Sequence, residues 1–213
     1  MNPISGIDSA LLSGPPVSLI SQMSGGIVLF CGDAGLSEIS SQLVGWRLAR
    51  QEQVLFLDGD NRFNPYPIAE WAKRIGADPG RFLSSIFISR AFTCHQMASL
   101  ITRRLGAAIA RHHPRLVLLA EPLATFYDEA IPFGERKTLL SRSIEALVRS
   151  AGEGVLIAVL TAPPRPVPKT ASLFSILRNA ADRLFAVHTD EREIFITEER
   201  DDFGGPPRRI GRH

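Results

Sequence analysis

The chain has 213 residues, of which 45% are hydrophobic and 22% charged, a composition typical of one globular domain with a large core. Its 24 basic and 22 acidic residues give a net charge of +2, which excludes a histone-like or tail-driven nucleic-acid binder but allows a local basic face. The two cysteines, Cys31 and Cys94, are too few for a disulfide framework or a four-cysteine zinc site, so we expect buried, reduced thiols.

The chain carries no visible targeting or membrane signal. No apolar run approaches the roughly 20 residues that a membrane span needs. The first residues lack the basic stretch and apolar core of a signal peptide. We therefore expect a cytoplasmic protein that has no membrane partner.

Short apolar runs alternate with longer segments of helical period, which is the pattern of βαβ units around a parallel sheet buried on both faces. The predicted strands are residues 26–31, 53–58, 84–90, 115–121, 154–161 and 183–189, and residues 193–198 form the last arm of a hairpin. The predicted crossover helices are residues 37–51, 67–75, 94–111, 135–151 and 171–181. We expect an α/β core over residues 25–198, between a lead-in segment (1–24) and a flexible basic tail (199–213) that contains Arg208, Arg209 and Arg212.

Two loops follow predicted strands at the sheet edge where parallel sheets bind ligands. Residues 162–170 contain four prolines in nine positions, which favour extended backbone and disfavour a helix. Arg165 and Lys169 in this loop have the charge to meet phosphates, while a plain connection or a protein contact remain alternatives. The second loop, residues 125–134, carries the acids Asp128 and Glu129.

A strand, a glycine-containing turn and a helix at residues 26–51 are the context of a phosphate-binding loop. A working GxxxxGK[ST] loop needs a second glycine, a lysine and a hydroxyl. Counted from Gly32, these places hold Ser37, Glu38 and Ile39, so all three requirements fail. Glu38 also replaces the attraction between a lysine and the phosphate charge by a repulsion. An interaction between two unit charges is worth roughly 4 kcal/mol at ~4 Å and an effective dielectric of 20. The degenerate loop consists of Gly32, Asp33, Ala34, Gly35, Leu36, Ser37, Glu38 and Ile39.

A plain βα turn, with Glu38 favouring the helix dipole, explains this segment best. Residual nucleotide binding through helix N–H groups, or binding of another anion, stays open as an alternative. No metal site is expected, because the adjacent His112 and His113 have no nearby cysteine or paired acid. The basic residues around this pair suit the C-terminus of a helix.

Four further segments carry motifs in a fixed order. Residues 4–14 form a lead-in, residues 56–65 match D-x-E-G-x-F-x-P in part, residues 89–96 match A-R-A-F-x-x-x-H-Q in part, and residues 116–127 form a Walker B-like strand with its continuation. Together they resemble the ATPase core of the RecA/RadA-type recombinase family over most of the chain. The resemblance implies a RecA-like P-loop NTPase fold, with a mostly parallel central sheet, helices on both faces and a C-terminal hairpin.

The resemblance also implies roles for single residues. Asp60 falls where the family keeps the glutamate that activates water, and Glu121 falls at its Mg²⁺-associated aspartate. Residues 161–162 replace the Asn-Gln sensor of γ-phosphate, and Arg165 and Lys169 fall in the second DNA-binding loop. Because the phosphate site is lost, we expect no catalytic residue and no bound cofactor.

The sequence therefore predicts a non-hydrolysing accessory or scaffold protein in DNA recombination or repair. Its partner would be a recombinase or a DNA-repair or translesion polymerase, with at most weak contact to single-stranded DNA. Residues 33–38 are also similar to ImuA-type mutasome proteins, which assist a translesion polymerase. One alternative is an ATPase whose ATP and Mg²⁺ site is completed by a neighbouring subunit and uses Ser37, Asp60 and Glu121. Another is a regulatory module unrelated to DNA, and a homo-oligomer is left open.

Overall fold

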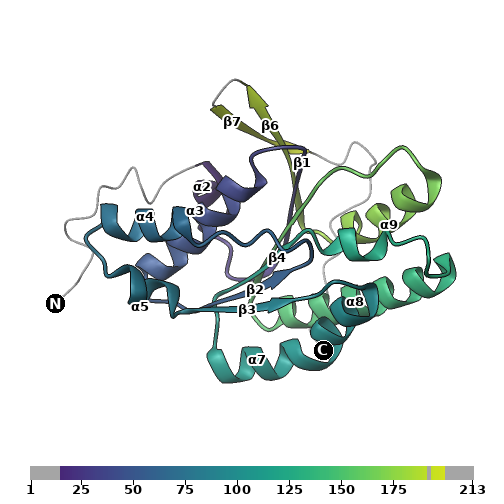
Figure 1. The fold of residues 1–213 in the computed structure, drawn as a ribbon, viewed down its shortest axis with the longest axis horizontal. Coiled ribbons are helices and arrows are strands. Elements are labelled where there is room, and N and C mark those ends of the chain that lie inside the picture. Colours follow the sequence, from purple (N-terminus) through teal and green to yellow (C-terminus); the bar gives the residue numbers. More distant parts are fainter. Residues whose placement is uncertain (1–14, 191–192, 200–213) are drawn as a thin grey trace.

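A seven-stranded sheet lies at the centre of the structure, a computed structural model that describes residues 15–190 and 193–199 (Figure 1). The strand order is β3-β2-β4-β5-β1-β6-β7, and all neighbours are parallel except β6 and β7. The strands are β1 (Gly26–Gly32), β2 (Val54–Asp58), β3 (Ile86–Arg90), β4 (Leu116–Ala120), β5 (Leu156–Thr161), β6 (Arg183–Asp190) and β7 (Glu193–Glu199). The strands of each parallel pair need a crossover connection, which the helices provide.

Helices cover both faces of the sheet (Figure 1). One face carries α2 (Pro15–Ile20), α3 (Leu36–Ala49), α4 (Tyr66–Arg74) and α5 (Pro79–Leu83). The other carries α6 (Cys94–Ser99), the π-helical η1 (Leu100–Arg104), α7 (Leu105–His112), α8 (Phe133–Gly152) and α9 (Pro168–Arg178). A short 3₁₀ helix, η2 (Pro122–Phe126), follows β4.

Each central strand contributes to two separate cores, because successive strand side chains point to opposite faces. In β1, Val28 and Phe30 pack beneath α3, while Ile27 and Leu29 pack in the other core. The fully buried Phe30 ring stacks on Phe185 of β6, with ring centroids 5.2 Å apart. The α/β class and the mostly parallel sheet are therefore confirmed. All seven predicted strands occur, with ends shifted by one or two residues.

Several predicted helices and loops need correction. The single helix predicted over residues 94–111 is divided by the π-helical segment η1. The proline-rich loop is shorter than predicted, because α9 begins at Pro168, where a missing N–H has no intrahelical partner to lose. The loop predicted over residues 125–134 likewise contains the end of η2 and the start of α8.

Three short helices were not predicted, namely α2, η2 and α5. The five-residue α5 is too short for a periodicity signal, although Asp78 before Pro79 is a recognisable start. Its carboxylate accepts hydrogen bonds from the N–H groups of Gly80 and Arg81. Residues 1–14 of the predicted lead-in and residues 200–213 of the predicted tail lie outside the described residues. Within the described ranges, no helix combines the length and the apolar composition needed to cross a membrane.

Replacing Phe30 by alanine should lower the free energy of unfolding by about 3–5 kcal/mol, because it leaves a cavity beside Phe185 in the centre of the sheet. Urea unfolding monitored by circular dichroism measures this change. Phe92→Ala is the matched control, since that ring is 68% exposed and its loss should change stability by less than about 0.5 kcal/mol. Equal effects of the two variants would contradict the packing described here.

Candidate functional site

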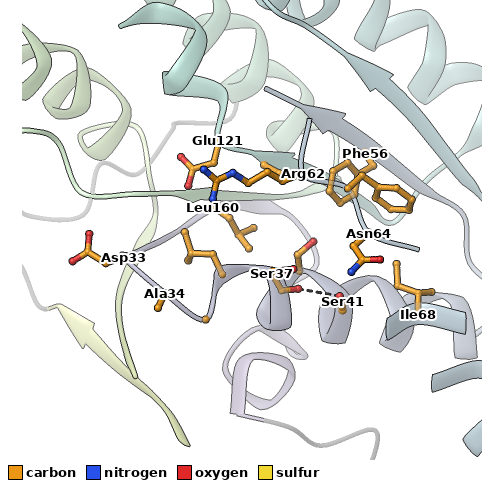
Figure 2. Close-up of a pocket in the computed structure, with 15 residues that line it drawn as sticks. Asp33, Ala34, Ser37, Ser41, Phe56, Arg62, Asn64, Ile68, Glu121 and Leu160 are labelled. Atoms are coloured by element: carbon orange, nitrogen blue, oxygen red, sulfur yellow. Dashed lines mark hydrogen bonds between the residues drawn. The ribbon is translucent and has the colours of Figure 1, made fainter. Parts of the chain in front are cut away.

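A cavity of about 180 Å³ opens where β2, β4 and β5 end, beside the first turns of α3 (Figure 2). This is the edge of the sheet at which the sequence predicted a ligand site. The charged residues that line the cavity are Asp33, Arg62 and Glu121. Ser37, Ser40 and Ser41 of α3 also line the cavity, as do Phe56, Phe63, Asn64 and Ile68.

The turn between β1 and α3 is short, since only residues 33–35 separate the two elements. Gly35 has a φ of 80°, a conformation that side chains other than glycine rarely adopt. A Cβ at Gly32 would lie 2.3 Å from the carbonyl oxygen of Val187 in β6. Both glycines therefore have backbone roles that involve no ligand.

The three positions that would hold phosphate face in different directions. Ser37 lines the cavity, whereas Glu38 is exposed and accepts a hydrogen bond from Nε2 of Gln42 at 3.0 Å. Ile39 is fully buried in the core beneath α3. The position where a GxxxxGK[ST] loop would carry its hydroxyl thus holds an apolar side chain that does not line the cavity.

Asp60 does not line the cavity. Its exposed carboxylate forms an ion pair with Nε of Arg62, and that arginine enters the cavity and ends near Glu121 (Figure 2). The acid predicted at the water-activating position is therefore neutralised by its own loop. The structure brings Ser37 and Glu121 to one cavity but leaves Asp60 and Glu38 outside it.

Asp58, at the end of β2, is a key polar residue that the sequence analysis did not single out. It is 0% exposed, and its carboxylate accepts hydrogen bonds from three backbone N–H groups, those of Asp60, Arg62 and Phe63, at 3.1–3.3 Å. Nε of Arg90 lies 3.6 Å from the same carboxylate. The position of an acid directly before a glycine turn was the available signal, since Asp caps turns in this way. Asp58 therefore fixes the loop that carries Arg62 into the cavity.

Glu121 is held by the end of β5. It has a left-handed backbone with φ of 48°, and its carboxylate oxygens lie 3.0 and 3.1 Å from the N–H of Ala162. The hydroxyl of Thr161 donates to the same carboxylate at 3.2 Å. Burial is the largest effect on this group and raises the pKa of Glu121, partly offset by these hydrogen bonds and by Arg62. Thr161 and Ala162, at the end of β5, thus bind the acid that follows the neighbouring strand β4.

Burial also raises the pKa of two further groups, those of Cys31 and Tyr127. The pKa of Cys31 is raised to about 11 and that of Tyr127 to about 12, with the charge of Glu121 adding to both shifts. The Tyr127 hydroxyl has no hydrogen-bond partner in the described part of the chain. Cys31 is partly buried and Cys94 is buried, and both are free thiols. Neither thiol has the lowered pKa of a nucleophile.

Arg165 and Lys169 lie away from the cavity. Both side chains are exposed, and Lys169 belongs to the first turn of α9 rather than to the loop. Neither forms an ion pair with a described carboxylate. The structure thus separates the two sets of residues that the sequence proposed for phosphate and for DNA.

The recombinase resemblance implies a Mg²⁺-bound triphosphate at this end of the sheet. No lysine lines the cavity, since Lys73, Lys137 and Lys169 belong to α4, α8 and α9. Two of its three charged residues are acids, and its volume is below the about 300–1,000 Å³ of ordinary ligand pockets. These residues do not fit the group. Among the described residues, no three His, Cys, Asp or Glu side chains gather as metal ligands either.

The family model described as Rad51 matches residues 25–175, which is most of the chain. The chain belongs to the Rad51 family. This confirms the resemblance to a RecA/RadA-type recombinase core that the sequence motifs indicated.

Two curated relatives are meiotic recombination protein DMC1 homologs. The one from Glycine max is 28% identical over 118 residues, which are 54% of this chain and 34% of the relative. The one from Arabidopsis thaliana is 28% identical over 104 residues, which are 47% of this chain and 30% of the relative. This chain therefore matches about a third of the length of each relative.

Replacing Asp58 by alanine should lower the free energy of unfolding by about 3 kcal/mol or more, because three N–H groups and Arg90 lose their acceptor. Asp60→Ala, which removes an exposed acid two residues away, should change it by at most about 1 kcal/mol. Thermal and urea unfolding of both variants test this difference. A stable Asp58→Ala protein would mean that the carboxylate does not hold the loop.

Glu121→Gln should become more stable relative to the wild type as the pH rises. The folded state raises the pKa of Glu121, so ionisation above the ordinary value of 4.5 disfavours the folded wild type, and the amide removes this penalty. Urea unfolding at a series of pH values from about 4 upward measures the difference in unfolding free energy between the two proteins. A difference that shrinks or stays flat as the pH rises would contradict the burial of this carboxylate.

Proposed function

We propose that this member of the Rad51 family is a non-hydrolysing accessory protein that acts in DNA recombination or repair. The family supplies the biological context, because both curated relatives are named as meiotic recombination proteins. The observation that carries the proposal is the β1–α3 turn. There the helix begins at Leu36, Glu38 turns outward to Gln42, and Ile39 is part of the core.

The remaining polar groups of the site support the same reading. In phosphoryl transfer the protein acts by positioning and by charge, so each missing contact removes a contribution to catalysis. Here Glu121 is bound to the end of β5 and Asp60 to Arg62, so both acids already have partners within the chain. Neither of these two acids therefore needs a ligand as its hydrogen-bond or ion-pair partner.

In this proposal the chain works as a scaffold. The loops at the carboxyl end of the sheet form a docking surface for a recombinase or for a DNA-repair or translesion polymerase. The exposed cations Arg165 and Lys169 provide a contact to single-stranded DNA. Two cations neutralise few phosphates, so this contact is weak and sensitive to salt.

Titration with a fluorescent ATP analogue and Mg²⁺ tests the proposal. The wild type should show no saturable binding up to millimolar nucleotide and no ATP hydrolysis above background. Glu38→Lys should not restore tight binding, because Ile39 stays in the core and residues 33–35 stay too short to wrap phosphates. Micromolar binding by the wild type, or turnover that Asp60→Asn abolishes, would instead favour an ATPase whose site a neighbouring subunit completes.

A further inference from the structure

A basic surface lies on the exposed side of η1 and α7, the helical segments beside the edge strand β3 (Figure 1). Its cations are all exposed and together form the α7 patch: Arg103, Arg104, Arg111, His113 and Arg115. The exposed helix positions between Arg104 and Arg111 are Gly106, Ala107 and Ala110, so no large side chain covers the surface between the arginines. The patch shares no residue with the cavity at the β1–α3 turn.

No neighbouring acid in the sequence compensates these charges. The segment from residue 79 to residue 120 is the longest stretch of the chain without Asp or Glu. In the described part of the chain, none of the four arginines forms an ion pair. Positive charge therefore gathers here, although the net charge of the whole chain is only +2. Like charges at short range repel each other, so a bound anion would stabilise the patch.

The electrostatics of a helix C-terminus account for only part of this patch. The partial negative charge of a helix end attracts cations within the last turn. Arg111 lies in the last turn of α7, which ends at His112. Arg103 and Arg104 lie in η1, which continues into α7 without a break, and Arg115 lies beyond the end of the helix. The helix end therefore does not explain these three arginines.

A π-helical turn holds two of the arginines side by side on the surface. In η1 the N–H of Leu105 donates to the carbonyl oxygen of Leu100, five residues earlier. Arg103 and Arg104 are exposed together in this wider turn, between the buried Ile101 and Leu105. Turns of this kind are rare and frequently occur at functional sites.

The residues around the arginines favour a duplex over a single strand. The sequence has no Phe, Tyr or Trp from residue 93 to residue 125, so the patch offers no such ring on which unpaired bases could stack. The His112 ring is itself stacked on Phe87 of β3, with centroids 3.7 Å apart. Arg104 and Arg111 are separated by about 10 Å along the helix axis. A DNA duplex carries one charge per about 1.7 Å of its axis, so its phosphates can meet both arginines at once.

The patch is separate from the loop that carries Arg165. The C-terminal end of α7 leads into the amino end of β4, whereas Arg165 follows the carboxyl end of β5. Because β4 and β5 are parallel neighbours, these two places lie at opposite edges of the sheet. One contact surface therefore does not include both groups of cations.

We infer that the α7 patch binds double-stranded DNA through its phosphate backbone, without preference for base sequence, and that Arg103, Arg104, Arg111 and Arg115 make the contacts. The choice of DNA as the nucleic acid rests on the proposed role in recombination or repair. The surface and the duplex go beyond that proposal, which assigns a single strand to the loops at the carboxyl end of the sheet. The inference does not depend on whether the chain binds nucleotide.

Fluorescence anisotropy of a labelled duplex of about 30 base pairs, titrated with the full chain between about 0.05 and about 0.3 M salt, tests this. Four phosphate contacts predict that the logarithm of the binding constant falls with the logarithm of the salt concentration with a slope of about −3 to −4. Arg103→Ala/Arg104→Ala should reduce this slope by about 2 and weaken binding at least about tenfold at about 0.1 M salt. Both side chains are exposed and alanine favours a helix, so this variant keeps the fold.

Arg74→Ala/Arg81→Ala is the matched control, since it removes two exposed cations from α4 and α5 on the opposite face of the sheet. It should leave the duplex affinity within about twofold and the slope unchanged. Wild-type affinity in Arg103→Ala/Arg104→Ala, or equal losses in both double variants, would overturn the inference. Oligothymidylate or polyglutamate that binds more tightly than the duplex, and is lost in the same variant, would assign the patch to single strands or to an acidic partner and overturn it too.

Arg165→Ala/Lys169→Ala separates this inference from the proposed function. This variant should weaken the binding of oligothymidylate and leave the duplex affinity within about twofold, because the loop lies at the other edge of the sheet. A loss of duplex binding as large as that of Arg103→Ala/Arg104→Ala would overturn the assignment to the α7 patch. ATP hydrolysis by the chain would refute the proposed function but leave the duplex result standing.

Discussion

Burial of the sheet on both faces leaves only the two ends of the strands for polar chemistry. The strands β1, β2, β4 and β5 are almost wholly apolar, since each packs against α-helical layers above and below. The polar residues of the candidate site lie at the last position of a strand, in the turn that follows it, or in the first two turns of the next helix. The architecture thus determines where a site occurs, while a few side chains determine what that site does.

Three acidic side chains in and near the cavity at the β1–α3 turn are bound by other groups of the chain. Asp58 binds the backbone of its own loop, Asp60 binds Arg62, and Glu121 binds the end of β5. Arg136 in the first turn of α8 is also held within the chain, because Nη1 donates a hydrogen bond to the carbonyl oxygen of Phe126 and the guanidinium carbon lies 5.7 Å from the centroid of the Phe133 ring.

The periodicity of the sequence predicted the fold, but it did not predict which charged side chains are buried. The apolar runs of β1, β2, β4 and β5 predicted strands correctly. A strand that is buried on both faces has apolar side chains on both sides, so its sequence is a short continuous apolar run. Arg136 was missed because a single polar residue in a helix gives no sign of whether it faces solvent or the interior, whereas the place of Asp58 directly before Gly59 was a signal that was not used. The mismatch at Ser37, Glu38 and Ile39 was visible in the sequence, but only the structure places Ile39 in the core and Glu38 outside the cavity. The start of α9 was also missed, since the prolines around it mask a helix that begins on one of them.

The burial of Ile39 makes it hard to convert this turn into a GxxxxGK[ST] loop by mutation. A lysine at position 38 is a single change on an exposed surface, but a hydroxyl at position 39 would enter an apolar core without a partner, at a penalty of about 1–3 kcal/mol. The three-residue turn would also have to lengthen while Gly32 stays pressed against β6. A variant with the hydroxyl but without the longer turn would therefore be less stable than the present chain. The core beneath α3, and not the exposed surface of the turn, thus limits how far this segment can change.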